Sequence, residues 1–298
     1  VNASDFTDAD EIVNKDAVST MTALGIINGK EDGSYFDPTG NVTRAEMAKM
    51  IATVLNQGAD VDGLYVGMNT GLTDVKGHWA ESYINYCYSL GIIAGRGNGK
   101  FDPAATVTGN EAAKMLLGVL GYNAEKSGLV GNDWAINVAA DAVNAGIAPK
   151  GIVLADAMTR EQAAQMAFQT LTADMVYYTN KGTTVIGSDG MQVIVGASAP
   201  VKVANSTTDD YRTVSADRDE VQQFCEKYFS DLSVNNNGSD DFGRPSEQWK
   251  NGSKEIGTYA STADASYSEK VSSKTLYSDL GLDKTTTVDV TEDGKANG

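Results

Sequence analysis

The chain has 298 residues, and 41% of them are hydrophobic, which is enough to build about two domains with packed cores. Its 40 acidic residues outnumber the 23 lysines and arginines. The resulting net charge of −17 excludes sequence-independent binding to nucleic acid, because the phosphates would be repelled. One histidine and two cysteines exclude His-rich or Cys-rich metal sites and a disulfide framework. No apolar run approaches the roughly 18 residues of a membrane helix, so we expect no membrane insertion.

No sequence pattern indicates a catalytic site. The nucleophile elbow, the zinc-protease helix, the P-loop and the dinucleotide-binding glycine pattern are all missing from the sequence. The histidine, His78, precedes Trp79 at a predicted helix start, a setting typical of a cap or surface residue. A pair of carboxylates remains as a route to catalysis, but acidic residues are too abundant to single one out. We therefore predict that the chain is not an enzyme.

The chain resembles itself three times over residues 1–173, and the clearest register is a threonine followed three residues later by Glu or Gln. The pairs are Thr43 with Glu46, Thr108 with Glu111, and Thr159 with Gln162. Each pair predicts a capping box at a helix start, in which the two residues satisfy each other's backbone amides. Apolar or small residues follow at +4, +7, +8, +11 and +12 from each threonine. This spacing predicts one buried helix face in each copy.

A shorter helical pattern precedes each of these helices. In copy one it runs through Val18, Met21 and Leu24, and in copy two it places Cys87 on the buried face. The pattern stops each time at a glycine followed by isoleucine, which predicts a left-handed C-terminal cap. These glycines are Gly25, Gly91 and Gly146.

Between the two helices of copies one and two lies a glycine-rich loop, at residues 29–38 and 95–103. Its glycines permit tight turns with positive φ, and its closing Asp-Pro predicts an extended exit towards the cap threonine. In copy three the spacing from the stop glycine to the threonine is 13 residues, against 18 and 17 in the other copies. We therefore expect a curtailed third loop.

Together these features resemble three tandem S-layer homology (SLH) domains, at residues 5–57, 72–122 and 133–173. The resemblance is carried by Phe6-Thr7-Asp8 and Leu72-Thr73-Asp74, by Trp79 and Trp134, by the Leu-Gly-Ile-Ile stop, by the loop ending in Phe-Asp-Pro, and by Thr-Arg-Ala-Glu at 43–46. It implies an all-α triplet that forms a three-pronged pseudo-trimer around a central three-helix bundle. It also implies that grooves between repeats bind the bacterial cell wall, in many members a secondary cell-wall polysaccharide capped by a pyruvate ketal.

Arg44 and Arg160 stand at the first position of their helices, where the macrodipole disfavours a cation by a few tenths to about 1 kcal/mol. Such a cation is explained if an anion binds there, and an arginine fork matches a carboxylate. With the family resemblance, we expect a polymer-binding set of Arg44, Arg160, Trp79, Trp134, Asp8, Asp74, Gly29 and Gly95. In this set the tryptophans stack on sugar rings and the aspartates accept from sugar hydroxyls. The alternative is that the tryptophans pack the prong cores and the arginines pair with nearby carboxylates.

Three departures from the family pattern predict unequal grooves. Copy two has Gly109 in place of the arginine, copy one has Val13 in place of the tryptophan, and copy three lacks most of its loop. We expect the sites around Arg44 and Arg160 to carry most of the binding and the Gly109 site to be weakened.

Residues 174–298 are predicted to be β-rich with one or two helices, which makes the whole chain α+β and multidomain. A hairpin is expected at residues 183–195, and a helix from about Asp217, with Asp217 and Glu220 as its cap pair. The shared apolar face of this helix would carry Val221, Phe224, Cys225, Tyr228 and Leu232. Asp240 and Asp241 favour a solvated turn over Ca²⁺ binding, since their spacing is not that of an EF-hand. The polar tail at 292–298 suggests that the natural chain continues.

The sequence thus predicts a secreted, non-enzymatic cell-surface protein without a cofactor. Its SLH triplet would anchor it to a cell-wall polysaccharide or to modified peptidoglycan, and residues 174–298 would begin a region for surface-layer self-assembly or display. The alternatives are an SLH-anchored carbohydrate-active enzyme and an adhesin, with the active module in or beyond 174–298. Two converging carboxylates about 5–10 Å apart would distinguish the enzyme.

Overall fold

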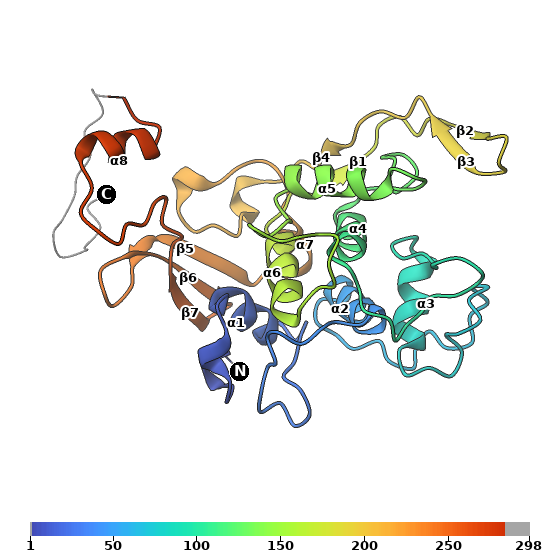
Figure 1. The fold of residues 1–298 in the computed structure, drawn as a ribbon, viewed down its shortest axis with the longest axis horizontal. Coiled ribbons are helices and arrows are strands. Elements are labelled where there is room, and N and C mark those ends of the chain that lie inside the picture. Colours follow the sequence, from blue (N-terminus) through green and yellow to red (C-terminus); the bar gives the residue numbers. More distant parts are fainter. Residues whose placement is uncertain (1, 284–298) are drawn as a thin grey trace.

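The computed structural model describes residues 2–283 and contains both helices and small sheets, so the fold is of mixed α+β type (Figure 1). The helical part contains α1 (Lys15–Ala23), α2 (Arg44–Leu55), α3 (Glu81–Ser89), α4 (Gly109–Leu120), α5 (Trp134–Asn144) and α6 (Arg160–Leu171). Two short 3₁₀ turns, Ala3–Asp5 and Ala9–Glu11, precede α1. Within residues 2–283, no helix combines the length and the apolar character that crossing a membrane requires.

The three long helices α2, α4 and α6 begin at the predicted threonines with capping boxes. The Thr43 hydroxyl accepts from the Glu46 amide at 3.1 Å, and the Glu46 carboxylate accepts from the Thr43 amide at 3.2 Å. The same reciprocal pair opens α4 and α6. The capping prediction is therefore confirmed in all three copies.

The short helices α1, α3 and α5 end as the glycine pattern predicts. Gly25, Gly91 and Gly146 have φ of 74°, 71° and 76°, the left-handed region that glycine enters without strain. Cys87 is fully buried, as predicted for a small core residue. Leu90, by contrast, is half-exposed although it continues the apolar pattern of α3.

A closed cycle of backbone hydrogen bonds joins the residues that precede the three cap threonines. Val42 donates to Met158 at 3.1 Å, Met158 donates to Val107 at 2.9 Å, and Val107 donates to Val42 at 2.9 Å. The cycle gathers the starts of α2, α4 and α6 around one centre. Because each of these amides and carbonyls is paired, the polar backbone at the centre carries no desolvation penalty.

Each long helix packs against the short helix of the following copy. α2 contacts α3, α4 contacts α5, and α6 returns to contact α1. Apolar residues of the long helices that are fully buried, such as Met47, Ile51 and Leu116, form the core of these pairs. Copies one and three are thereby joined, although they lie at opposite ends of the helical part of the chain.

The region after α6 contains three small antiparallel sheets. β1 (Val176–Tyr177) pairs with β4 (Val201–Lys202), β2 (Thr183–Ile186) pairs with β3 (Gln192–Val195), and β5 (Leu232–Ser239), β6 (Pro245–Asn251) and β7 (Lys254–Ala260) form the third sheet. Two helices, α7 (Phe224–Tyr228) and α8 (Ser273–Asp279), complete the described part, and the predicted polar tail at 292–298 lies outside it. Trp249 of β6 is buried with its ring 5.0 Å from that of Phe168 on α6, so the third sheet packs on the helical part.

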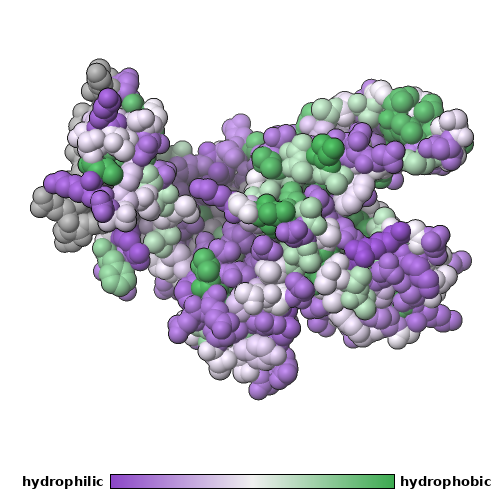
Figure 2. Space-filling model, viewed as in Figure 1, coloured by the Kyte–Doolittle hydropathy of each residue, from purple (hydrophilic) through white to green (hydrophobic). Residues whose placement is uncertain are grey.

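The hairpin predicted at 183–195 is present, and it projects from the body of the molecule (Figure 1). Its apolar side chains remain exposed on the sheet, and Figure 2 shows them as a green patch at the end of the projection. The exposed residues are Val185, Ile186, Met191, Val193 and Val195. An isolated two-stranded sheet of this kind is only marginally stable in water without a covering partner.

The prediction of a helix that begins at about Asp217 is wrong. The observed helix α7 begins at Phe224, and its cap pair is Gln223 with Glu226. The preceding residues are extended because Val221 forms an antiparallel bridge with another segment of the chain. Leu232, assigned to the same helix face by its spacing, instead opens strand β5. Cys225 is buried on α7, as expected.

Candidate ligand grooves

The first candidate site is a cavity of about 510 Å³ that we call the Arg44 groove. Its principal lining residues come from all three copies: Arg44 from copy one, Gly95, Arg96, Glu111 and Lys114 from copy two, and Trp134 from copy three. The packing of each long helix on the next copy brings these residues together. Their spread over 91 positions of sequence explains why only the folded chain forms the cavity.

Arg44 shapes one wall of this groove. Its side chain is 4% exposed, with Nε donating to the Phe101 carbonyl at 2.8 Å and Nη2 donating to the Ala94 carbonyl at 3.0 Å. The guanidinium also lies 4.4 Å from the centre of the Phe101 ring. The arginine therefore fixes both ends of the glycine-rich loop of copy two, and the loop in turn lines the cavity.

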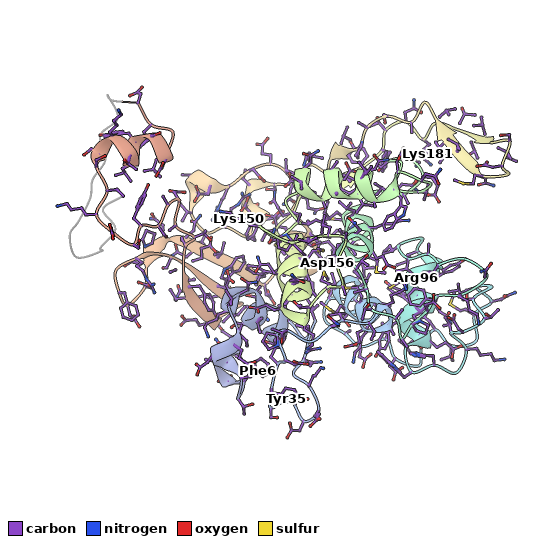
Figure 3. All side chains as sticks on the ribbon, viewed as in Figure 1. Phe6, Tyr35, Arg96, Lys150, Asp156 and Lys181 are labelled. Carbon is purple, nitrogen blue, oxygen red and sulfur yellow. The ribbon has the colours of Figure 1, made fainter. Side chains whose placement is uncertain are left out.

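Glu111 joins two arginines at the floor of the groove. Its carboxylate accepts from Arg44 and also from Nη2 of Arg96, at 2.6 Å in the second case; Arg96 is labelled in Figure 3. Burial raises the pKa of Glu111, but hydrogen bonds from Arg96 and the charge of Arg44 outweigh it, so the pKa lies below its ordinary value. The carboxylate is thus a fixed anion held by two cations.

Lys114 is the accessible cation of the Arg44 groove. Among the residues that the structure describes, none forms an ion pair with its ammonium group, which lies 5.7 Å from the centre of the Trp134 ring. Burial lowers the pKa of Lys114 and outweighs the charge of Glu125, which raises it, while the repulsion from Arg44 lowers it further. An anion in the cavity would relieve both costs.

The Arg160 groove is a second cavity of about 340 Å³ with the same plan. Its lining includes Arg160 from copy three, Gly29, Glu46 and Lys49 from copy one, and Trp79 from copy two. Arg160 donates from Nε to the Phe36 carbonyl at 2.8 Å and from Nη2 to the Asn28 carbonyl at 2.6 Å. Each contact thus repeats that of Arg44 in the other groove.

The two grooves differ in how tightly the central carboxylate is held. Glu46 lies 3.9 Å from Arg160 and its side chain is 35% exposed, whereas the side chain of Glu111 is 14% exposed and contacts two arginines. Lys30 takes the place of Arg96 in the Arg160 groove but pairs with Asp37 at 2.7 Å. The lining therefore contains three cations and one carboxylate in the Arg44 groove, against two and one in the Arg160 groove.

The aromatic residue at each rim is positioned differently. Trp79 is 54% exposed in the Arg160 groove, while Trp134 is partly buried and packs against the core. Lys49 lies 5.7 Å from the centre of the Tyr83 ring rather than over Trp79. Both tryptophans line a cavity, and Trp134 also packs against the core as the alternative supposed. Their predicted stacking on sugar rings stays a prediction.

The two glycines of the predicted set are required by close backbone approach. A Cβ on Gly29 would lie 2.8 Å from the Gly33 carbonyl oxygen, and one on Gly95 would lie 2.9 Å from that of Lys100. Both contacts are shorter than any side chain tolerates. Each glycine therefore allows its loop to close beside the arginine.

Asp8 and Asp74 hold the same loops from outside the two cavities. The Asp8 carboxylate accepts from the Phe36 and Asp37 amides at 2.9 and 2.8 Å. The Asp74 carboxylate accepts from the corresponding amides of copy two, both at 2.9 Å. Neither aspartate is among the residues that line the Arg44 or Arg160 groove. Their predicted contact with sugar hydroxyls stays a prediction.

At the third position between copies, the backbone of Leu154 fills the space of the missing arginine. A Cβ on Gly109 would lie only 2.9 Å from the Leu154 Cα. The short third loop, marked by Lys150 and Asp156 in Figure 3, reaches this point because the Gly109 amide donates to the Asp156 carbonyl at 3.0 Å. The same register places Gln162, Gln165 and Val13 where the other grooves have Glu, Lys and Trp.

Sequence reasoning missed Lys49, Lys114 and Arg96. Both lysines stand at the sixth position after a cap threonine, and the third copy has Gln165 there. The signal was therefore present in the repeat register, but a lysine on a helix is too common to stand out without the cavity beside it. Arg96 follows Gly95 directly and could have been noted as a cation within the loop.

The Ca²⁺ site considered at Asp240 and Asp241 stays a prediction. Asp240 accepts from the amides of Phe242 and Arg244 at 3.0 and 2.9 Å and from Arg244 Nε at 2.7 Å. In the part of the chain that the structure describes, no group of three or more His, Cys, Asp or Glu side chains is arranged to hold a metal ion. The arrangement around Asp240 is that of a turn closed by its own arginine.

The comparisons with known proteins give a match to one family model and several partial matches to bacterial surface proteins. The S-layer homology domain model matches residues 5–48 and 71–113. The S-layer protein of Bacillus licheniformis is 32% identical over 111 residues, which is 37% of this chain and 12% of that protein. The cell surface protein of Thermoanaerobacter kivui is 29% identical over 208 residues, 68% of this chain and 26% of that protein. The exoglucanase XynX of Acetivibrio thermocellus is 32% identical over 190 residues, 56% of this chain and 16% of that protein.

This chain spans about a quarter or less of the length of these relatives. Copy three, which the structure pairs with copies one and two through the hydrogen-bond cycle, lies outside the two matched regions. The matches agree with the loops and capping boxes of copies one and two. The chain therefore contains two S-layer homology domains, at residues 5–48 and 71–113, and is a protein of the cell wall or cell surface.

Proposed function

We propose that this chain anchors a longer surface protein non-covalently to the bacterial cell wall by binding an anionic secondary cell-wall polysaccharide, pyruvylated or otherwise carboxylate-bearing. The observation that carries the proposal is the pair of cavities with excess positive charge in a chain of net charge −17. A cationic cleft raises the local concentration of anions. The acidic surface around it repels anions, so they bind in the cleft and not elsewhere. The three helix pairs would form the three-pronged SLH arrangement, with a ligand groove at two of its three junctions.

In this proposal the roles within each groove are divided. Lys49 and Lys114 make the ionic contact with a ligand carboxylate, since neither has an ion-pair partner among the described residues. Trp79 and Trp134 supply the flat faces on which sugar rings stack. Arg44 has three of its five N–H groups committed to protein acceptors, so it acts on the ligand chiefly through its charge and the loop that it holds.

The test is sedimentation of the full chain with purified cell-wall sacculi, before and after hydrofluoric acid removes the wall-linked polymer. We expect binding to be lost on stripping, and to fall by about tenfold or more in the double variant Lys49→Ala/Lys114→Ala, because each lost charge-assisted bond is worth about 1.5–3 kcal/mol. Lys150→Ala/Lys181→Ala, which removes two exposed lysines outside the grooves, is the charge-matched control and should bind normally. Full binding to stripped walls would instead indicate peptidoglycan as the ligand, and unchanged binding of the lysine variant would exclude the proposed grooves.

We propose an anchoring rather than a catalytic role for the described region. Among the relatives, an exoglucanase and an amylopullulanase match this chain over 16% and 9% of their own length. These names favour the alternative in which an anchor of this type serves an enzyme whose catalytic module lies beyond the matched part. Release of reducing sugar from glucan or xylan by this chain alone would overturn the non-catalytic assignment.

The exposed hairpin favours a second candidate function, self-association at the cell surface. Residues 182–196 include a single charged side chain, Asp189, so two acidic chains repel each other least at this point. Both outer edges of the two-stranded sheet are unpaired in the described structure, and such edges accept a further strand. Sedimentation velocity should show association of the wild-type chain that Val185→Thr/Val193→Thr abolishes. Equal association of both proteins would remove the hairpin from consideration.

A further inference from the structure

A third and larger groove is lined by residues of copy one, of copy three and of the sheet β5–β7. Its volume is about 1050 Å³, larger than either cationic cavity. We call it the composite groove. The residues on which the argument depends are Val13, Asp16 and Gln165 on the helical side and Asp241, Phe242 and Gln248 on the sheet side.

The composite groove occupies the junction at which the third SLH-type site would open. Val13 and Gln165, which line it, hold the register positions of the groove tryptophans and lysines. The arginine end of that junction is closed by Leu154 against Gly109. The sheet therefore replaces the missing loop as the second wall of the opening.

The electrostatics of the composite groove are opposite to those of the other two. Four carboxylates and two cations line it. Arg244 is neutralised by Asp240, with Nη2 and Oδ2 2.7 Å apart, and the Lys15 ammonium donates to the Ala9 carbonyl at 3.0 Å. The carboxylates outnumber the cations of this lining, so its net charge is negative and disfavours the anionic polymer proposed for the Arg44 groove.

An aromatic ring stands open at the rim of the groove. Phe242 is 76% exposed and is not part of the hydrophobic core, and among the described residues its ring contacts the Arg244 guanidinium alone, at 5.2 Å. Covering a phenyl ring that is exposed at the edge of a polar groove removes apolar surface from water, which is favourable. The C–H face of a pyranose ring has the size and apolar character to do so.

The lining of the groove is rich in hydrogen-bond acceptors. Gln165 donates to Gln169 at 2.9 Å and Gln248 donates to Glu255 at 3.3 Å, and each of the two side chains also has an amide oxygen that can accept. The carboxylates of Asp16 and Asp241 add further acceptors. Sugar hydroxyls donate hydrogen bonds, so a lining rich in acceptors suits an uncharged, hydroxyl-rich ligand.

We propose that the composite groove binds a neutral oligosaccharide, with Phe242 as the stacking platform and the acceptors of Gln165, Gln248 and Asp241 receiving hydroxyl hydrogen bonds. The site is separate from the Arg44 and Arg160 grooves and has the opposite charge preference. It does not depend on the anchoring proposal, because its ligand carries no carboxylate. A glycan segment without acidic substituents would be its natural occupant.

The test is isothermal titration of the full chain with two neutral probes, cellohexaose and chitohexaose. We expect at least one probe to bind with a dissociation constant below about 10 mM. The variant Phe242→Ala should raise this dissociation constant about tenfold or more. Phe242 lies exposed in a turn, so its substitution leaves the fold intact, which circular dichroism verifies. Phe242→Tyr keeps an aromatic face and should restore binding.

The variant Lys49→Ala/Lys114→Ala separates this proposal from the anchoring function. It should bind the neutral probes as the wild type does, whatever its behaviour with sacculi. Absence of binding for both probes up to about 10 mM would overturn the proposal. So would equal affinity of the wild type and Phe242→Ala, or a loss of binding confined to the lysine variant.

Discussion

The Arg44 groove and the junction at Gly109 occupy the same place in the repeat, yet one is an open cationic cavity and the other is closed at its arginine end. The difference shows that the arginine and the long loop act as one unit. Arg44 needs the carbonyls of Ala94 and Phe101, which only a long loop can bring to it. Where the loop is short, the backbone of Leu154 lies against the start of α4, and only glycine fits at position 109.

The two open grooves also differ from each other in how tightly the central carboxylate is held. Glu111 is held by two arginines and is largely buried, whereas Glu46 is a third exposed and lies 3.9 Å from Arg160. Water already solvates Glu46 in the folded chain. Loss of the arginine should therefore leave a buried carboxylate with one of its two partners in the first groove, and a solvated carboxylate in the second.

The largest expected effect comes from removing each arginine in turn. Arg44→Ala should lower the free energy of unfolding by about 3–5 kcal/mol, because Glu111 loses a partner inside the protein. Arg160→Ala should cost about 1–3 kcal/mol, the cost of two unpaired carbonyls. Urea unfolding followed by tryptophan fluorescence measures both. Equal losses would show that the buried Glu111 does not distinguish the grooves.

The second prediction concerns pH and sets Glu111 against Asp16. The folded-state pKa of Glu111 is lowered, so its stabilisation is present above its ordinary value of 4.5 and is lost as the pH falls through the folded pKa. Glu111→Gln should cost about 1.5–3 kcal/mol at pH 7 and progressively less below pH 4.5.

Asp16 should show the opposite sign. Burial raises the pKa of Asp16, against smaller opposing backbone hydrogen bonds, so its contribution is most favourable below its ordinary value of 3.8 and is lost as the pH rises through the folded pKa. Asp16→Asn should therefore gain stability relative to the wild type on going from pH 3 to pH 7. Parallel pH profiles for the two variants would contradict this assignment.

The smallest expected effect compares two glycines on α4. Gly109→Ala places a Cβ 2.9 Å from Leu154 and should destabilise by about 1–2 kcal/mol, the overpacking cost less the helix preference of alanine. Gly118→Ala meets only the Ile92 side chain, at 3.4 Å, and should be neutral or stabilising by up to about 1 kcal/mol. The midpoint temperatures of thermal unfolding of the two variants and the wild type test this prediction. If Gly109→Ala were as stable as the wild type, the third loop would have to move away from the added Cβ at little cost.

The helical part could be predicted in detail because its signals are local. A cap threonine, an N3 carboxylate and a stop glycine such as Gly91 act within one or two turns of their own position. The hairpin at 183–195 was equally local. The helix expected from Asp217 failed because tertiary bridging holds the residues before Phe224 in an extended form, which no local pattern announces.

The candidate site was only partly predictable for the same reason. Arg44, Arg160 and the two tryptophans were found from their register in the repeat, and all four line cavities. The free lysines were not found, because Lys114 becomes distinctive only when Trp134 from another copy lies beneath it. The aspartates of the predicted set turned out to hold loop amides outside the cavities.

The sequence by itself determined where α2, α4 and α6 begin, where α1, α3 and α5 end, and that the third loop is short, since capping, periodicity and loop length are properties of short segments. The tertiary structure alone decided which residues share a groove, because each cavity draws on three copies that are distant in sequence. It also decided that the arginines hold loops while Lys49 and Lys114 line the cavities without an ion-pair partner among the described residues. Burial and pairing set these roles, and both depend on neighbours that only folding brings together.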